Sequence, residues 1–397
     1  MPLETKLTKL LNIRVPVVQG GMQWYVTSLL SILTALTQPS PEALRHAIRE
    51  TRKMTKYPFG VNITLLPSIN PPDYEGYARA AVEEGVKVFE TAGNNPGPLI
   101  KFFKSHGCIV IHKCTTIRHA KSAERLGVDC LSIDGFECAG HPGEEDIGGI
   151  VLLARAAQEL KVPYIASGGF ADGRGLASAL ALGACGVNMG TRFMCTVESP
   201  IHQNIKDKII ASTERDTVHI FRTLHNTARV FKNAISEQVV ALERRPGGAN
   251  AGRLVYVNGD PDYGIWTAGI VMGLIKDCPT CEDLLRTIEK EAEEVIGELQ
   301  TFRVTAKAKL LEWWHAHPSA RMSDVIMQPE SEQRIVMYPA VARRDLDRPA
   351  TTSPPFRLCA ARQHQAMQKP GCGMPHWHPS DFLFFLSSCK PAQTGGQ

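Results

Sequence analysis

Residues 162–194 read VPYIASGGFADGRGLASALALGACGVNMGTRFM. The apolar runs at 162–166 and 184–189 predict two buried strands, and the Ala- and Leu-rich stretch 173–182 between them predicts a helix. Small residues follow each strand: Ser167, Gly168 and Gly169 after the first, and Gly190 and Thr191 after the second. Because glycine lacks a Cβ atom, backbone amides at both strand ends can approach an anion closely.

These two strand ends favour a particular fold. In a (β/α)8 barrel, also called a TIM barrel, the loops after the last two strands form the usual phosphate site. Two glycine clusters separated by one crossover helix therefore predict such a barrel with a bound phosphate group. Tight turn geometry alone is the alternative explanation for these glycines.

Strand and helix alternate through the whole N-terminal half of the chain. The predicted strands are 15–22, 30–36, 59–66, 86–92, 108–114, 128–134, 162–166 and 184–189. The predicted helices are 41–55, 74–84, 98–105, 117–126, 150–160 and 173–182. Eight strands alternating with helices predict a closed parallel barrel rather than an open sheet. No GxGxxG follows the first strand, which argues against a Rossmann domain.

The first unit of this α/β pattern is short. Fewer than ten residues separate the first two predicted strands. A parallel crossover that contains a helix needs at least about 10–12 residues. We therefore expect the first βα unit of the barrel to be truncated.

The chain divides into three predicted parts. Residues 1–198 and part of 254–316 would form the barrel, and residues 199–253 a smaller helical domain that covers the barrel mouth as a substrate lid. Residues 317–397 are rich in Pro, Arg and Ser and are predicted to be a disordered tail. The helices predicted after the barrel strands are 201–212, 223–242, 266–275 and 282–311.

The composition limits the classes of function. Hydrophobic residues make up 43% of the 397 residues, enough for a sizeable core, and no apolar run reaches the roughly 18 residues of a membrane span. The net charge of +4 is modest and spread out, so we expect no nucleic-acid partner and no membrane partner. The N-terminus lacks a secretory pattern, which predicts a cytoplasmic location. The eleven cysteines are scattered, several of them in apolar runs, as expected of buried reduced thiols. We expect no metal site.

Active sites of such barrels lie at the carboxyl ends of the strands. Lys113 ends an apolar strand, where an ammonium group needs an anionic or π partner; a flavin ring is one candidate and a structural ion pair the other. His141 lies in the loop GFECAGHPGEED and suits proton transfer near neutral pH, although a lone loop histidine is also often structural. Cys138 is a competing nucleophile, as in an IMP dehydrogenase-like enzyme. The other polar residues at predicted strand ends are Gln19, Asn62, Thr64, Glu90, Asp134, Ser167, Asn188 and Thr191.

Several long motifs, in order, resemble the nitronate monooxygenase family, also called 2-nitropropane dioxygenases. The pattern is most similar to the bacterial branch known for NADH:quinone reductase activity. The resemblance covers about residues 1–300 and rests on VPVVQGGMQW (15–24), FGVNITLLP (59–67), ETAGNNPG (90–97), IHKCTTIRHA (111–120), SIDGFECAGHPGEED (132–146), IASGGFADGRG (165–175), NMGTRF (188–193), NTARVFKNAIS (226–236) and GDPDYGIWTAGIVMGLI (259–275).

Family members are FMN-containing (β/α)8 barrels with an added helical domain, so the resemblance implies an FMN cofactor. It makes His141 the active-site histidine, a base or substrate contact. The residues that it implies for binding the flavin ring and ribityl chain are Gly20, Gly21, Met22, Thr64, Lys113, Asp134, Ala139 and Gly140. Ser167 also belongs to the implied cofactor site, and the phosphate would be held by Gly168, Gly169, Gly190 and Thr191.

The resemblance implies oxidation of alkyl nitronates with O2 to carbonyl compounds and nitrite. NADH:quinone reduction at the same FMN site is the alternative, with NADH as electron donor and the loop 65–72 shaping the nicotinamide site. An inactive, truncated barrel is a further alternative, because of the short first unit. In both active readings the partner is a small molecule. The sequence does not determine the oligomeric state.

Overall fold

The computed structural model describes residues 3–22, 31–65, 71–244, 261–262 and 264–316, without the side chains of Met22, residues 303–314 and Ala316. The chain divides into two compact units, residues 1–309 and 310–397. The fold and the site described below belong to the first unit. The predicted disordered tail, 317–397, lies outside the described residues.

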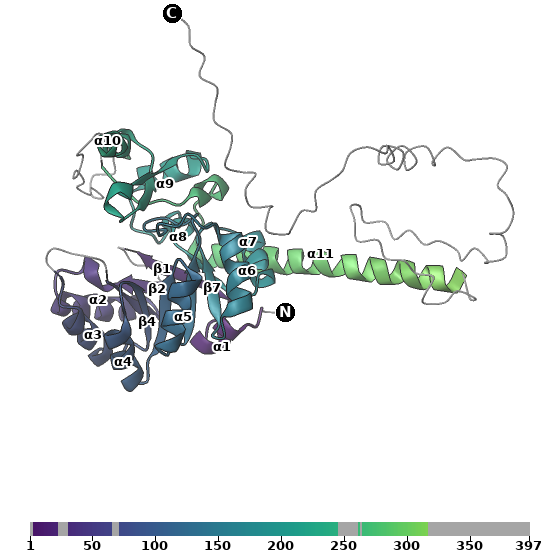
Figure 1. Ribbon diagram of the computed structural model, residues 1–397, viewed down its shortest axis with the longest axis horizontal. Coiled ribbons are helices and arrows are strands. Elements are labelled where there is room, and N and C mark those ends of the chain that lie inside the picture. The colour runs from purple at the N-terminus through teal and green to yellow at the C-terminus, as the bar shows by residue number, and fades with distance from the viewer. Residues whose placement is uncertain (1–2, 23–30, 66–70, 245–260, 263, 317–397) are drawn as a thin grey trace, which may run out of the picture. The chain divides into compact units, whose positions relative to one another are not determined.

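Eight parallel strands form a closed barrel, which confirms the predicted fold class (Figure 1). β1 closes the barrel by pairing with β8 in parallel, with Val17 opposite Val187 and Gln19 opposite Met189. The strands follow one another around the barrel in chain order: β1 (Val17–Met22), β2 (Ser31–Thr34), β3 (Gly60–Leu65), β4 (Val88–Gly93), β5 (Ile109–Cys114), β6 (Cys130–Asp134), β7 (Tyr164–Ser167) and β8 (Val187–Met189).

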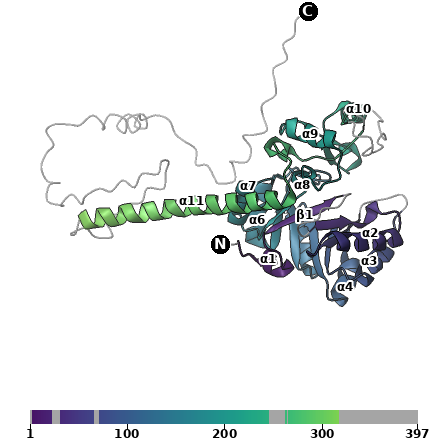
Figure 2. The ribbon, with the colours of Figure 1, turned by 180° about the vertical axis from the view of Figure 1, so that it is seen from behind.

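Helices cover the outside of the barrel, as Figure 2 shows from behind. Side-chain caps set where several of them begin: Ser40, Thr116 and Asp172 each accept a hydrogen bond from a backbone N–H in the first turn. The covering helices agree closely with the predicted ones: α2 (Pro41–Met54), α3 (Tyr74–Glu83), α4 (Gly97–Ser105), α5 (Ile117–Arg125), α6 (Gly149–Glu159) and α7 (Gly173–Ala181).

The first βα unit closes despite its short connection. β1 pairs with β2 in parallel, with Gln19 opposite Ser31 and Met22 opposite Leu33, and the register is irregular between these two pairs. The 3-10 turn η1 (Ala35–Thr37) follows β2 directly. The joining residues 23–30, to which the predicted truncation refers, lie outside the described residues.

A short helix, α1 (Lys6–Leu11), seals the amino-terminal end of the barrel. Its Leu7 is fully buried in an apolar cluster inside the barrel. The other members of that cluster are Leu11, Val18, Ile32, Val88, Ile111, Cys130, Ile165 and Cys185. Gly186 makes room for this packing, since a Cβ atom there would lie 2.4 Å from Leu7 Cδ2. The barrel therefore has an apolar lower interior and is open for chemistry only at its other end.

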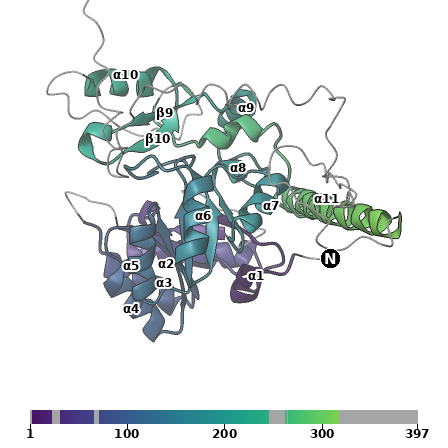
Figure 3. The same ribbon diagram turned by 45° about the vertical axis from the view of Figure 1, so that its right-hand side comes forward.

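A second layer lies over the carboxyl ends of the strands (Figure 3). It contains an antiparallel hairpin that the sequence analysis missed: the predicted helix 223–242 is wrong in its first half, where Ala228–Phe231 pairs with Thr217–Ile220. Phe231 is held there by stacking on Trp266, with ring centroids 4.3 Å apart. The elements of the layer are α8 (Thr191–Met194), α9 (Gln203–Ala211), β9 (Thr217–Ile220), η2 (Arg222–Leu224), β10 (Ala228–Phe231), α10 (Ala234–Glu243) and η3 (Ile270–Leu274).

Two further differences concern the end of the first unit. The predicted helix 266–275 is reduced to the 3-10 turn η3: residues 265–269 form neither helix nor strand, and Trp266 and Ala268 are buried in the apolar cluster of the second layer. By contrast, α11 (Cys281–Ala316) is one long helix, as predicted for 282–311. Its first turns pack onto the barrel through the buried side chains of Leu284, Leu285, Ile288 and Ala292.

Two negative findings hold for the described residues. None of their helices has the length and apolar character needed to cross a membrane. No disulfide joins their cysteines. Cys108, Cys130 and Cys185 are buried, as their place in apolar runs predicted.

The seal at the barrel's lower end can be tested by Leu7→Ala. The substitution empties a fully buried site, so we expect the free energy of unfolding in urea to fall by about 2–5 kcal/mol. Leu299→Ala is the matched control, because Leu299 on α11 is 51% exposed. The control should stay within about 0.5 kcal/mol of the parent. Equal losses in the two variants would contradict the packing described for α1.

Candidate active site

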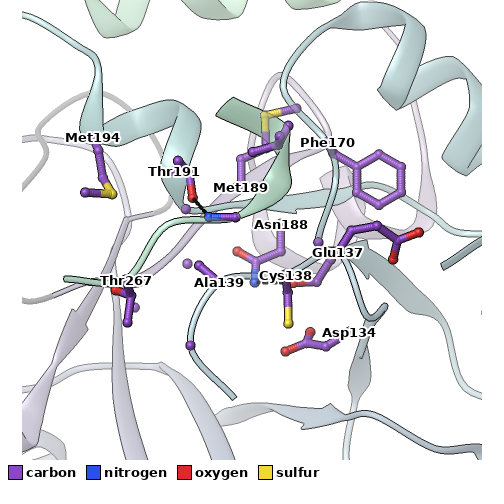
Figure 4. Close-up of a pocket in the computed structure, with 18 of the residues that line it drawn as sticks. Asp134, Glu137, Cys138, Ala139, Phe170, Asn188, Met189, Thr191, Met194 and Thr267 are labelled. Carbon is purple, nitrogen blue, oxygen red and sulfur yellow. Dashed lines mark hydrogen bonds between the residues drawn. The ribbon is translucent and has the colours of Figure 1, made fainter. Parts of the chain in front are cut away.

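A cavity of about 400 Å³ lies at the carboxyl ends of the barrel strands, between the barrel and the second layer (Figure 4). Eleven of the fourteen predicted site residues line it. These are Gly20, Gly21, Lys113, Asp134, Ala139, Gly140, Ser167, Gly168, Gly169, Gly190 and Thr191. The ends of β1, β5, β6, β7 and β8 thus converge on one place, as the barrel geometry requires.

Of the remaining three predicted residues, Thr64 and His141 do not line the cavity. Met22 ends β1, and its side chain lies outside the described part of the structure. Thr64 lies in β3, where its hydroxyl donates to Asn62 Oδ1 over 2.8 Å. His141 is an exposed residue of the loop after β6, one residue beyond the lining residue Gly140.

The sequence analysis missed part of the lining. Thr34 ends β2, and Thr37 lies in the turn η1 that follows it. Glu137 and Phe170 lie in loops that also carry predicted residues. Met189 ends β8. The others come from the second layer, namely Met194, Ser199, Ile201, Thr267, Gly269 and Val271. Thr34 could have been found because it lies near the end of a predicted strand. The second-layer residues could not, because nothing local in the sequence marks a residue that reaches the cavity from a separate layer.

A cluster of charged side chains forms the floor of the site. Lys113 Nζ lies 3.4 Å from Asp134 Oδ2 and 4.0 Å from Glu90 Oε1. Glu90 is 1% exposed, and its Oε2 accepts a 2.7 Å hydrogen bond from Asn62 Nδ2. The Lys113 ammonium group, at the end of β5, therefore has two carboxylate partners, as expected of a structural ion pair. Lys113 also lines the cavity, where a flavin ring is its other candidate partner.

The environment shifts the pKa values of these groups. Burial raises the pKa of Glu90, which the nearby Lys113 ammonium opposes only in part. Burial lowers the pKa of Lys113, but the carboxylates of Asp134 and Glu90 outweigh this and the net shift is upward. Lys113 is therefore a persistent positive charge at the cavity.

Cys138 lines the cavity with its sulfur on the side of Asp134 (Figure 4). Burial, followed by the Asp134 carboxylate, raises the pKa of this thiol to about 12. A nucleophilic cysteine must react as the thiolate. The Cys138 nucleophile considered from the sequence is therefore disfavoured.

Backbone conformation explains the glycines after β7. Gly168 and Gly169 have φ angles of 86° and 88°, which side chains rarely adopt. A Cβ atom on Gly168 would also lie 2.8 Å from the backbone N and Cβ of Cys138. Gly190 differs, because its φ is −110° and a Cβ atom there would meet nothing within 4 Å. The space beside Gly190 belongs to the cavity that it lines.

The second layer holds the loop that follows β6. Arg229 of β10 is buried, and its guanidinium donates to the carbonyl oxygens of Cys138 (3.1 Å) and Phe136 (2.8 Å). The same guanidinium lies over the Phe136 ring, 4.8 Å from its centroid. Within the second layer, Thr191 Oγ1, two residues after the end of β8, accepts a 3.0 Å hydrogen bond from the Gly269 N–H (Figure 4). The walls and the cover of the cavity are thus one connected structure.

The sequence model of the nitronate monooxygenase family matches residues 4–291, a range that contains every residue lining the cavity. The chain belongs to the nitronate monooxygenase family. It is therefore an FMN-dependent oxidoreductase that acts on a small molecule.

Individual relatives carry several names. A dehydrogenase of a 5-hydroxy-7a-methyl-1-oxo-octahydro-1H-indene-4-carboxyl-CoA from Rhodococcus jostii is 30% identical and covers 76% of this chain and 99% of its own. A nitronate monooxygenase from Paraburkholderia phytofirmans is 24% identical, over 75% of this chain and 97% of its own. The structure of FabK from Thermotoga maritima is similar with a TM-score of 0.67 and 32% identity, covering 75% of this chain and 99% of that one.

The alignment with the Rhodococcus protein also bears on chain length. It runs over 359 positions yet uses only 76% of this 397-residue chain. The relative therefore contains several tens of residues that have no counterpart here.

Gly190→Ala tests whether the cavity is the cofactor site. The added methyl group meets no protein atom, so the free energy of unfolding of the FMN-free protein should be unchanged. Intrusion on a bound cofactor should cost about 1–3 kcal/mol of binding free energy, or roughly ten- to hundredfold in the FMN dissociation constant. Fluorescence titration with FMN measures it.

Gly297→Ala is the matched control, since Gly297 in α11 also has open space around a Cβ atom but lies away from the cavity. It should bind FMN as the parent does. Unaltered FMN affinity in Gly190→Ala would show that the cofactor does not lie against Gly190.

Glu90→Gln tests the buried carboxyl group. Because the folded-state pKa of Glu90 is raised, the folded chain holds the proton more tightly than the unfolded chain. The parent's free energy of unfolding should therefore decline relative to the variant's as the pH rises above about 4.3, the unfolded pKa. Urea unfolding of both proteins across this range measures the difference. A parent that gains stability relative to the variant over the same range would mean that Glu90 is ionised more readily in the folded state.

Proposed function

We propose that the protein oxidises alkyl nitronates with O2 to carbonyl compounds and nitrite, with FMN bound in the cavity. The observation that carries the proposal is that the cavity is lined only by residues within the family match and includes part of the loop that bears His141. Every lining residue lies within residues 4–291, and Ala139 and Gly140, which precede His141, form part of the wall.

The residues present fit a flavin. Asn188 Oδ1 is buried and has no hydrogen-bond partner among the described residues, although Asn188 lines the cavity. A buried acceptor of this kind requires a donor, and FMN has a ring N–H and ribityl hydroxyl groups that can serve. Gly20 keeps this acceptor accessible, because a Cβ atom there would lie 2.7 Å from Asn188 Oδ1.

We assign the cofactor contacts by their place in the cavity. The phosphate would lie at the loops after β7 and β8, against Gly168, Gly169, Gly190 and Thr191. The ring and ribityl chain would lie against Gly20, Gly21, Lys113, Asp134, Ala139, Gly140 and Ser167. Thr64 and His141 do not line the cavity, so we do not include them among the direct FMN contacts. Met22 stays an expectation.

When bound, FMN supplies one- and two-electron redox chemistry. The chain's own groups set the conditions for that chemistry. Lys113 presents a lasting positive charge at the cavity, which can stabilise negative charge that develops nearby. The apolar side chains of Met194, Ile201 and Val271 exclude water on the side of the second layer.

We assign His141 the role of base toward a neutral nitroalkane, from which it would remove the proton on the carbon that carries the nitro group. A nitronate has already lost that proton and does not need the base. The two substrate forms therefore separate the role of His141 from the rest of the site.

NADH:quinone reduction is the second candidate. It is favoured by the apolar lining contributed by Met194, Ile201 and Val271, which suits a planar, apolar acceptor such as a quinone. Relatives at 30% identity that are named as dehydrogenases also favour hydride chemistry. The loop 65–72, which the resemblance places at a nicotinamide site, lies mostly outside the described residues.

The deciding experiment adds one reductant at a time to the purified, FMN-loaded protein without oxygen. We expect propyl-2-nitronate to bleach the flavin absorbance and NADH to leave it unchanged. With oxygen present, the nitronate should be consumed with formation of nitrite. Bleaching by NADH, with turnover of a quinone and none of the nitronate, would instead establish the second candidate.

FMN binding tests the third alternative, an inactive, truncated barrel. A protein that remains colourless after incubation with FMN would overturn both candidates, because each needs the bound flavin. His141→Asn supplies the control within the site. It should retain FMN and nitronate oxidation, and lose turnover of the neutral nitroalkane by about a hundredfold or more.

A further inference from the structure

The ring of His141 makes one described hydrogen bond, and its partner belongs to the second layer. His141 Nδ1 lies 3.0 Å from the backbone carbonyl oxygen of Thr227, immediately before β10. A carbonyl oxygen can only accept a hydrogen bond, so Nδ1 must carry the proton. In the neutral imidazole the other nitrogen, Nε2, then has the free lone pair.

Thr227 is itself held in place from the loop of His141. Its N–H donates to Glu144 Oε1 over 2.8 Å, and its hydroxyl donates to Glu144 Oε2 over 2.5 Å. Thr227 is 1% exposed, so the Thr227 end of both bonds is buried, whereas Glu144 is exposed. Glu144 therefore fixes Thr227, whose carbonyl oxygen accepts the hydrogen bond from His141. Glu144 and His141 are three positions apart in the same loop.

Backbone pairing fixes the distance between these two segments. Gly140 and Arg229 form an antiparallel bridge in which each N–H donates to the other's carbonyl, over 3.1 and 2.6 Å. The Arg229 guanidinium adds its bonds to Cys138 and Phe136. The Thr227 carbonyl is thus held on both sides, by Glu144 and by the bridge next to His141. A carbonyl held in this way can select one ring orientation and one tautomer.

We propose that Thr227 and Glu144 are positioning residues that hold His141 as the Nδ1–H tautomer, with Nε2 free to take the substrate's proton. The catalytic use of Nε2 rests on the function proposed above, whereas the tautomer and its dependence on Glu144 do not. The second layer then does more than cover the cavity, because its Thr227 sets which ring nitrogen of His141, in a barrel loop, carries the proton.

The tautomer can be read directly by long-range ¹H–¹⁵N NMR of the ¹⁵N-labelled full chain, in which protonated and unprotonated ring nitrogens are well separated. His141→Gln identifies the His141 signals by their loss. We expect Nδ1 to be the protonated nitrogen of the neutral ring in the parent. In Glu144→Ala the anchor of Thr227 is lost, and we expect a mixture of the two tautomers.

Two matched variants separate positioning from general damage. Glu145→Ala removes the same kind of side chain from the next position, which is exposed and makes no contact with Thr227 among the described interactions, and should leave the parent tautomer unchanged. Thr227→Val removes the hydroxyl donor but keeps the carbonyl. It should shift the tautomer less than Glu144→Ala does.

Kinetics add a second readout. Glu144→Ala should lower kcat for a neutral nitroalkane on the order of tenfold, with KM and nitronate oxidation little changed. An Nε2–H tautomer in the parent, or an unaltered tautomer in Glu144→Ala, would overturn the positioning role whatever the enzyme's substrate proves to be. A tautomer that shifts as expected in a protein without nitronate activity would uphold the positioning and overturn only the proposed function.

Discussion

The structure depends on the closure of the barrel by β1. This strand carries backbone hydrogen bonds to both β2 and β8, so it joins the first and last strands into a ring without free edges. Closure brings Gly20 and Gly21 on one side within reach of Asn188 and Gly190 on the other. Without it, the two groups of small residues that line the cavity would lie on opposite edges of an open sheet. The number of residues between β1 and β2 therefore matters less for the site than the pairing itself.

Inside the ring, polarity divides the barrel into two parts. The lower interior is filled by aliphatic side chains under α1. The upper interior carries Glu90, Lys113 and Asp134, whose charges compensate one another where water is scarce. The apolar part supplies the burial that stabilises the fold, and this allows the upper part to retain charged groups that contribute little to stability.

The sequence predicted the barrel well because its signals are local. Apolar runs followed by small residues marked strands such as 162–166 and 184–189, and an Ala- and Leu-rich stretch marked the helix 173–182. The same rule found the strand-end part of the site. The hairpin was missed because β9 and β10 are only four residues each, and their extended form depends on distant partners such as Trp266. The lining residues of the second layer escaped prediction for the same reason, since their place is set by tertiary contacts.

The way α11 packs has a consequence for how the chain can vary. Among the described side chains of α11, the last fully buried one, Ala292, comes one residue after the end of the family match at 291. Gly173 at the start of α7 lies so close to α11 that a Cβ atom would be 2.3 Å from the Cβ of Glu291, so the helix and the barrel constrain each other up to that point. Beyond it, the described side chains of α11 are largely exposed. Val295 and Ile296 are still partly buried against the barrel core, whereas the described side chains from Glu298 to Phe302 are exposed. The barrel core therefore places no packing constraint on those exposed positions.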